Sequence, residues 1–175
     1  ASGDTRRESE RHLGGLALVT GGSERYWTER ILHNLVGSVH MWEPELTVEI
    51  WDFGLSAEAI ADISTWSNVD LRRLPMHRLP AHLGINGTGA YAAKPWVTLD
   101  ALTRYSSVLW IDANAELRRP LESSGMLRHI SVRGAFFVQH PFLFPTAQFH
   151  HPAAVRGLGC HAPDGSLPHC ATTFM

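Results

Sequence analysis

The chain has 175 residues, 44% of them hydrophobic, which suffices for one sizeable core but not for two ordinary domains. Its formal net charge of -2, with 18% charged residues, excludes the strongly basic surface that nucleic-acid binding requires, so no nucleic-acid partner is expected. The apolar runs fall far short of the roughly 20 residues that cross a bilayer, so we expect no transmembrane segment in this chain.

The two ends of the chain differ in character. Residues 1–12 are polar and charged without an apolar period, and they predict a flexible lead-in or stem before a single domain over residues 13–175. The chain starts at Ala1, and residues 171–175 have the pattern of an interrupted strand. We therefore expect a fragment that is truncated at its C-terminus.

Alternating strand and helix patterns begin at residue 16. Apolar runs separated by amphipathic stretches are typical of β-α units. The alternation predicts an α/β fold with a mostly parallel sheet and helices on both of its faces. The expected elements are strands over residues 16–20, 47–52 and 69–74, and helices over residues 24–39, capped by Ser23, and 56–66, capped by Ser56.

The second half of the domain is less regular. Residues 75–89 are rich in Pro, His and Gly and predict a long loop, and the same residue types dominate from residue 140 onward. The expected elements are a helix over residues 91–105 with Pro95 in its first turn, a buried strand over 108–111, a helix over 121–130 and a strand over 134–138.

The strand over residues 108–111 stops abruptly at Asp112, with Asn114 two positions on. Ligands of open α/β sheets bind beyond the carboxyl ends of the strands, so chemistry is expected here. Mg²⁺ and Mn²⁺ prefer oxygen ligands, and both side chains can reach one ion where the chain turns. The alternative is a turn in which Asp112 makes an Asx-type hydrogen bond and Asn114 adopts a left-handed conformation.

A second candidate site lies where the first strand meets the first helix, at Thr20-Gly21-Gly22. Backbone N–H groups at a helix start attract a phosphate or a uracil carbonyl, and the glycines permit close approach. The alternative is an ordinary tight β-α turn. A dinucleotide-binding fingerprint is excluded, because residues 24–27 replace its later glycines.

Three motifs together resemble the GT-A-fold glycosyltransferases. Residues 112–114 (DAN) are similar to a variant, D-x-N, of the acidic D-x-D motif of that family. Residues 51–56 (WDFGLS) resemble the D-x-G-L-s turn after the second strand, and residues 91–95 (YAAKP) resemble a Y-x-x-K-P segment on the helix before the acidic strand. The resemblance covers residue 16 to about residue 139, and it implies that the α/β fold is GT-A-like (Rossmann-like).

The resemblance implies a divalent cation, Mn²⁺ or Mg²⁺, that is held by Asp112 and Asn114 and in turn holds the diphosphate of a nucleotide sugar. Lys94 would face the same diphosphate as a point charge, the alternative being a lysine whose stem lies along a helix surface. A His near the C-terminal end often completes the metal site in this family, which makes His169 or His161 a candidate ligand.

The resemblance also implies which residues contact the nucleotide. The turn of Thr20, Gly21 and Gly22 would seat it, and Asp52 would contact its base or ribose. The alternative for Asp52 is that it sets, with Gly54, the turn before the Ser56 cap. Trp110 is expected in the core.

A glycosylation pattern bears on the compartment, whereas the two cysteines do not decide it. Cys160-His161 and His169-Cys170 could form a Cys₂His₂ zinc set, but their spacing matches no standard zinc finger; the alternatives are a Cys160–Cys170 disulfide and two unpaired thiols. Asn86-Gly87-Thr88 is an N-glycosylation acceptor pattern. We expect a secretory or Golgi lumen, with any membrane anchor outside this chain.

The sequence therefore predicts a glycosyltransferase that moves a sugar from a nucleotide-sugar donor, expected to be a UDP-sugar, to a glycan or protein acceptor. No residue is assigned as the general base. Two alternatives stay open: a non-catalytic GT-A-like module that binds nucleotides or glycans, and a small metal-binding interaction domain around Cys160 and Cys170.

Overall fold

The structure is a computed structural model, and it describes residues 15–75, 89–134, 137–139 and 170–174. Its elements are β1 (Leu16–Gly22), α2 (Glu24–Thr28), α3 (Ile31–Trp42), β2 (Thr47–Asp52), α4 (Ala57–Ile63), β3 (Val69–Arg73), α5 (Gly89–Ala101), β4 (Ser107–Trp110), the 3₁₀ helix η3 (Leu121–Ser124), α6 (Met126–Arg133), β5 (Phe137–Gln139) and β6 (Cys170–Phe174). The predicted lead-in over residues 1–12, the glycosylation pattern at Asn86, and Cys160, His161 and His169 lie outside the described residues.

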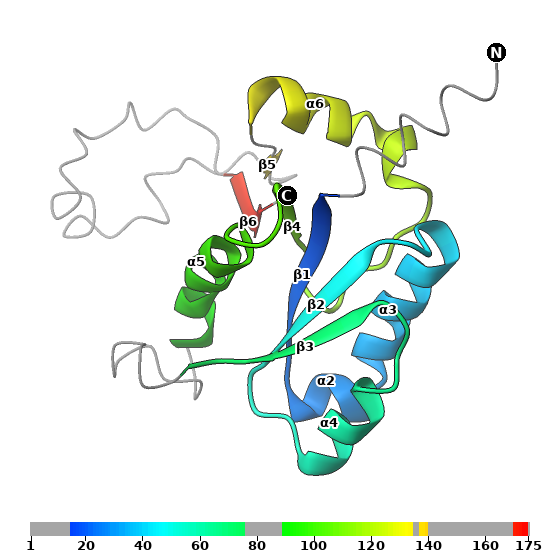
Figure 1. The fold of residues 1–175 in the computed structure, drawn as a ribbon, viewed down its shortest axis with the longest axis vertical. Coiled ribbons are helices and arrows are strands. Elements are labelled where there is room, and N and C mark those ends of the chain that lie inside the picture. Colours follow the sequence, from blue (N-terminus) through cyan, green and yellow to red (C-terminus); the bar gives the residue numbers. More distant parts are fainter. Residues whose placement is uncertain (1–14, 76–88, 135–136, 140–169, 175) are drawn as a thin grey trace, which may run out of the picture.

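Four parallel strands form the central sheet in the order β3-β2-β1-β4, and β5 pairs with β6 in a separate antiparallel ladder. Helices α2, α3 and α4 cover one face of the sheet and α5 covers the other (Figure 1). The predicted α/β fold, a mostly parallel sheet with helices on both faces, is confirmed. None of the helices in the described ranges has the length and apolar character of a membrane span.

Strand alternation divides the core into two clusters. On the α3 and α4 face, Leu18, Val48 and Ile50 pack with the inward stripe of α3, which includes Leu32 and Leu35. On the α5 face, smaller residues of the helix meet large strand side chains; the buried members of this cluster are Val19, Trp51, Leu74, Val97, Ala101 and Trp110. Trp110 is 2% exposed, so its predicted place in the core is confirmed.

Two predicted helices are each divided in the structure. The helix expected over residues 24–39 ends at Thr28, because Arg30 adopts a left-handed conformation (φ 63°), and α3 then begins at Ile31. Ser23 occupies the N-cap position of α2 without a capping bond from its side chain. The helix expected over residues 121–130 is divided by Gly125 at φ 70° into η3 and α6.

The order of the strands places a topological switch beside β1. The chain proceeds from β1 to β2 and β3 on one side, and then returns through α5 to add β4 on the other side of β1. In open α/β sheets ligands bind at such a switch point, outside the carboxyl ends of the strands. The ends of β1 and β4 are therefore the part of this fold where a site is expected.

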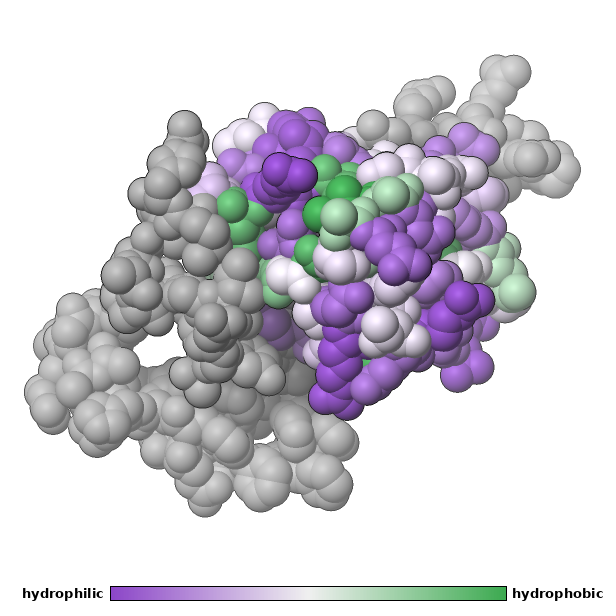
Figure 2. All heavy atoms as spheres, turned by 90° about the horizontal axis from the view of Figure 1, so that it is seen from below, coloured by the Kyte–Doolittle hydropathy of each residue, from purple (hydrophilic) through white to green (hydrophobic). Residues whose placement is uncertain are grey.

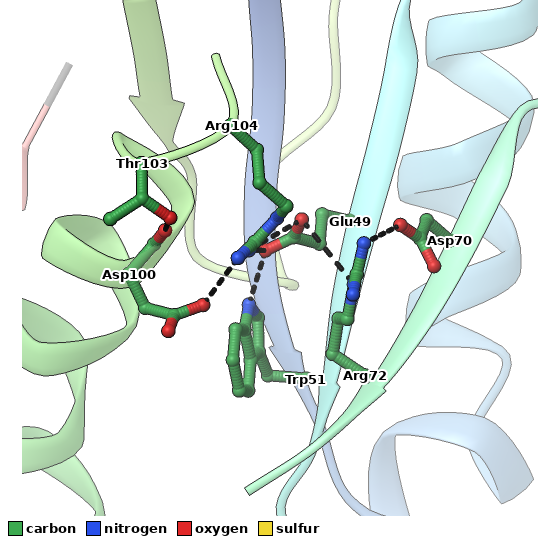
Figure 3. A network of polar contacts seen from close by, with 7 residues as sticks. All are labelled: Glu49, Trp51, Asp70, Arg72, Asp100, Thr103 and Arg104. Carbon is green, nitrogen blue, oxygen red and sulfur yellow. Dashed lines mark hydrogen bonds and ion pairs between the residues drawn. The ribbon is translucent and has the colours of Figure 1, made fainter.

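A buried ion network joins β2 to the turn after α5 (Figure 3). The carboxylate of Glu49 is fully buried, and Arg104 Nη2 donates to both of its oxygens at 2.9 and 3.0 Å. The indole of Trp51 donates to the same carboxylate at 2.7 Å, and Arg72 Nε lies 3.7 Å from it. Burial opposes the charge of Arg104, but hydrogen bonds to Asp100 and Glu49 outweigh it and raise its pKa.

Candidate functional site

Asp112 lies at the switch point. The N–H of Ile111 donates to the carbonyl of Val19 at 3.0 Å, so the pairing of β4 with β1 continues one residue past the strand and delivers Asp112 to the sheet edge. Its Oδ1 accepts a hydrogen bond from Lys94 Nζ at 2.6 Å and another from Trp110 Nε1 at 3.0 Å. The carboxylate remains 40% exposed, so it faces both the protein and the solvent at this edge.

Lys94 reaches Asp112 from α5. Its neighbours Ala93 and Val97 are buried against the sheet, which holds this turn of the helix on the α5 face. The side chain of Lys94 is only 11% exposed, and its ammonium lies 5.5 Å from the centre of the Trp110 ring, within the range of a cation–π contact. The sequence interpretation assigned Lys94 to a diphosphate and Asp112 to a metal ion, but in the structure these two residues form an ion pair with each other.

Trp110 has a second role that the sequence interpretation missed. Residues i and i+2 of a strand point to the same face. This rule places Trp110 beside Asp112, and its indole N–H fixes the carboxylate while its ring faces the ammonium of Lys94. The alternation of residues 108–112 is the signal that could have revealed this contact.

Asn114 lies on the other side of the strand end. The carbonyl of Asp112 accepts from the N–H of Ala115 at 2.9 Å, which closes a turn. The exposed Asn114 lines a small open hollow toward α3, together with Ile31, Asn34, Ala113, Ala115 and Glu116. The left-handed conformation considered for Asn114 is wrong, because among the described non-glycine residues only Arg30 and Asn68 have positive φ. That Asp112 and Asn114 share one ion stays a prediction.

Gly21 and Gly22 are not the tight turn that the sequence suggested: they are the last residues of β1 and pair with Trp51 and Asp52 of β2, and the ring of Phe53 lies against Gly21. A Cβ on Gly21 would lie 2.2 Å from Cε2 of Phe53, so the missing side chain makes room for this ring. A Cβ on Gly22 would come within 3.1 Å of Ile50 and Leu32 on the opposite face. Thr20 is fully buried, and its hydroxyl has no hydrogen-bond partner in the described part of the chain. Its predicted role in seating a nucleotide, with both glycines, stays a prediction.

Replacing Gly21 by alanine is expected to lower the free energy of unfolding by about 1–3 kcal/mol, because the new methyl group overlaps Phe53 in a packed region. Urea denaturation measures this loss. The matched variant Gly21→Ala/Phe53→Ala removes the overlap, so it should lose less than the two single changes added together. Full additivity of the two losses would contradict the proposed contact.

Asp52 makes the turn that follows β2. Its Oδ1 accepts from the N–H groups of Gly54 at 2.8 Å and Leu55 at 2.7 Å, and Gly54 adopts φ 104°. Ser56 accepts from the N–H of Ala59, which confirms the predicted cap of α4. The Asp52 turn is therefore an Asx-type turn, and its contact with a base or ribose stays a prediction.

The turns after β1 and β2 are tied to each other. The N–H of Phe53 donates to the carbonyl of Gly22 at 2.7 Å, and the N–H of Glu24 donates to that of Gly54 at 3.1 Å. The carboxylate of Glu24 accepts from the N–H of Ser56 at 2.8 Å. Figure 2 shows the molecule from this end of the strands, with hydrophobic residues gathered toward the middle of a mostly hydrophilic face.

The described residues offer few ligands for a cation. These residues contain no cluster of three His, Cys, Asp or Glu side chains that could hold a metal ion. Asp112 supplies one carboxylate, which is sufficient where a nucleotide contributes phosphate oxygens, since Mg²⁺ is often bound by one or two carboxylates plus substrate phosphates. Asp112 thus fits a cation of this kind, and the predicted ligand His169 lies outside the described residues.

Comparison with solved structures gives matches among GT-A-type glycosyltransferases. The chain aligns with the galactosyltransferase LgtC, solved with donor and acceptor sugar analogues, with a TM-score of 0.53 and 15% identity over 90% of this chain and 56% of that one. Matches to S. aureus TarS 1-349 (TM-score 0.46, 13% identity, 71% of this chain and 34% of that one) and to the bifunctional glycosyltransferase WbbM (0.49, 14%, 77% and 25%) are weaker.

The LgtC match shows that the fold is shared with this class of enzyme. The chain spans a little over half the length of LgtC and about a third or less of the other two proteins. No protein-family model matches the sequence, and no curated protein matches it.

Proposed function

We propose that this chain forms the nucleotide-sugar-binding part of a glycosyltransferase, with a UDP-sugar as donor and a glycan or protein as acceptor. The observation that carries the proposal is the Lys94–Asp112 pair at the carboxyl ends of β1 and β4. The LgtC match supports it through the fold. An ammonium and a carboxylate at a switch point are suited to a diphosphate and to the cation that accompanies it.

The chemistry of sugar transfer explains why these groups are needed. When the bond between the sugar and the diphosphate breaks, negative charge develops on the departing phosphate oxygens. Lys94 would stabilise that charge, and Asp112 would hold a Mn²⁺ or Mg²⁺ ion. When bound, the ion supplies further positive charge at the diphosphate. We propose Thr20, Gly21, Gly22 and Asp52 for the nucleotide, with Asn114 and His169 as further ligands of the ion.

The proposal is tested by calorimetric titration of the chain with UDP in the presence and absence of Mn²⁺. We expect UDP to bind and Mn²⁺ to raise its affinity. In Asp112→Asn, the factor by which Mn²⁺ raises the affinity for UDP should be at least 10-fold smaller. Asparagine keeps the shape of the side chain and can still accept bonds from Lys94 and Trp110, so the change isolates the charge. Equal effects of Mn²⁺ on the parent and the variant would contradict the assignment of Asp112.

A non-catalytic binding module is the second candidate, and two observations favour it: Asp112 is already paired with Lys94, and Asn114 faces the α3 side. Release of free sugar from a UDP-sugar distinguishes the two. An enzyme should hydrolyse the donor slowly when no acceptor is present, whereas a binding module should retain it intact.

We propose the secretory pathway as the compartment, on the strength of the Asn86-Gly87-Thr88 pattern.

A further inference from the structure

The two oxygens of the Asp112 carboxylate have different surroundings. Oδ1 accepts a hydrogen bond from Lys94 Nζ at 2.6 Å and another from Trp110 Nε1 at 3.0 Å. Oδ2 accepts no hydrogen bond in the described part of the chain, and 40% of the side chain is exposed. A cation can therefore reach Oδ2 from the solvent without displacing either donor.

The two donors to Oδ1 differ in rigidity. The ammonium of Lys94 has three N–H groups on a flexible stem, so it can bond either oxygen of a carboxylate or both of them. The indole of Trp110 has a single N–H, which points outward in the plane of its ring. This ring is 2% exposed and belongs to the buried cluster on the α5 face, which prevents it from turning. The fixed indole N–H therefore decides which oxygen of Asp112 faces the protein.

Rotation of the carboxylate is the motion that this contact restricts. The terminal torsion of an aspartate is broad and roughly two-fold, so the two oxygens exchange places readily when nothing holds them. If Lys94 were the only donor, Asp112 could present both oxygens to the ammonium, and a cation at the carboxylate would then meet a positive charge at shorter range. With Oδ1 held by the indole, the orientation that leaves Oδ2 open exists before any ligand binds.

We propose that Trp110 is a positioning residue: its indole N–H keeps Oδ1 of Asp112 on the protein side and so reserves Oδ2 for the divalent cation that accompanies a nucleoside diphosphate. Trp110 acts through Asp112 and needs no contact with the cation or the diphosphate. Lys94 and the cation then bind the same carboxylate at once, through different oxygens. This inference rests on the proposed function, because it requires the cation and the diphosphate that are proposed there.

The test is Trp110→Phe, which removes the indole N–H and keeps an aromatic ring beside the ammonium of Lys94. Calorimetry measures the affinity for UDP with and without Mn²⁺. The factor by which Mn²⁺ raises this affinity should be about 10-fold smaller in the variant, which is the size of effect expected when a ligating group loses a hydrogen-bond partner. The affinity without metal should stay within about twofold, because Lys94 retains a ring beside it. An equal loss with and without Mn²⁺, or a Mn²⁺ factor as large as that of the parent, would overturn the proposal.

Trp51→Phe is the matched control. Trp51 is 3% exposed and donates its indole N–H to Glu49 at 2.7 Å, so the change removes the same group from an equally buried tryptophan and leaves the contacts of Asp112 in place. It should change the Mn²⁺ factor by less than about twofold. A reduction equal to that of Trp110→Phe would show a general disturbance of the sheet and overturn the proposal.

A measurement with Trp110 intact covers the case in which Trp110→Phe fails to fold. The ¹H–¹⁵N spectrum of Asp112→Ala gives the resonance of the Trp110 indole N–H without its acceptor. In the unaltered chain with Mg²⁺ and UDP, this resonance should stay away from that position, because the indole keeps Oδ1 while the cation takes Oδ2. A resonance that moves to the Asp112→Ala position would show that the cation displaces the indole, and it would overturn the proposal.

The titration of the parent separates this inference from the proposed function. If UDP binds and Mn²⁺ raises its affinity, but Trp110→Phe behaves as the parent does, only the role of Trp110 is overturned. If UDP does not bind to the parent, or Mn²⁺ leaves its affinity unchanged, the proposed function fails and this inference fails with it.

Discussion

Replacing Arg104 by methionine is expected to lower the free energy of unfolding by about 3 kcal/mol. The change removes both hydrogen bonds that Arg104 donates to the fully buried carboxylate of Glu49. Trp51 still donates one hydrogen bond to the Glu49 carboxylate, and Arg72 Nε lies 3.7 Å from it, so the buried charge keeps some of its partners. Urea denaturation at neutral pH measures the loss.

Two control variants separate the buried charge from lost packing. Glu49→Leu/Arg104→Met removes the fully buried charge together with its partner, and the ion pair that Asp100 loses is partly exposed, so this protein should recover most of the stability that the single change loses. Arg25→Met removes an exposed pair with Glu29, and its effect on stability should be far smaller than that of Arg104→Met. A double variant as unstable as Arg104→Met would show that the arginine acts through packing and not through Glu49.

Replacing Lys94 by methionine should weaken UDP binding by roughly 10- to 100-fold while changing uridine binding by less than about threefold. A hydrogen bond to a charged group is worth about 1.5–3 kcal/mol, which corresponds to that range. The methionine retains the apolar stem beside Trp110, so the comparison of the two ligands isolates the ammonium. Calorimetric titration with each ligand, in the absence of metal, gives the two ratios.

The salt dependence of the same binding provides an independent check. Because Lys94 is 11% exposed, its contribution should persist when the ionic strength is raised, whereas the contribution of an exposed lysine would shrink. Equal weakening for UDP and uridine would indicate a disturbed helix α5. No weakening for either ligand would remove Lys94 from the site and take away the main support for the glycosyltransferase proposal.

Much of the fold follows from local patterns in the sequence. The strand predicted over residues 47–52 is β2 with the same bounds, because a short apolar run between turn residues indicates a buried strand. The cap at Ser56 was also predictable, because a hydroxyl cap is a local signal. The helix that contains Pro95 was expected too, but its first-turn placement of Pro95 is wrong, because α5 begins at Gly89 and Pro95 lies inside it. The parallel arrangement followed from the alternation of such elements.

Other features depend on contacts that no local pattern encodes. The left-handed conformation of Arg30 brings Trp27 and His33 to a common partner, Asp62, from two different helices. The pairing of Glu49 with Arg104 joins residues 55 positions apart, and a glutamate inside a strand gives no sign of its partner. The sequence placed Lys94 and Asp112 at the same edge, but not in contact, because side-chain direction at a strand end is set by the neighbouring helix.

The position of β1 in the sheet has a consequence for how the chain folds during synthesis. One edge of β1 pairs with β2, which follows soon after it in the chain. The other edge pairs with β4, which is synthesised much later, and this pairing joins Leu16 to Ser107. Contacts between residues so far apart form late, because the loop that joins them must first be closed. A nascent chain that has reached only β3 therefore presents an unpaired, apolar strand edge to other chains. The time between the synthesis of β3 and that of β4 is thus when misassembly competes most directly with folding.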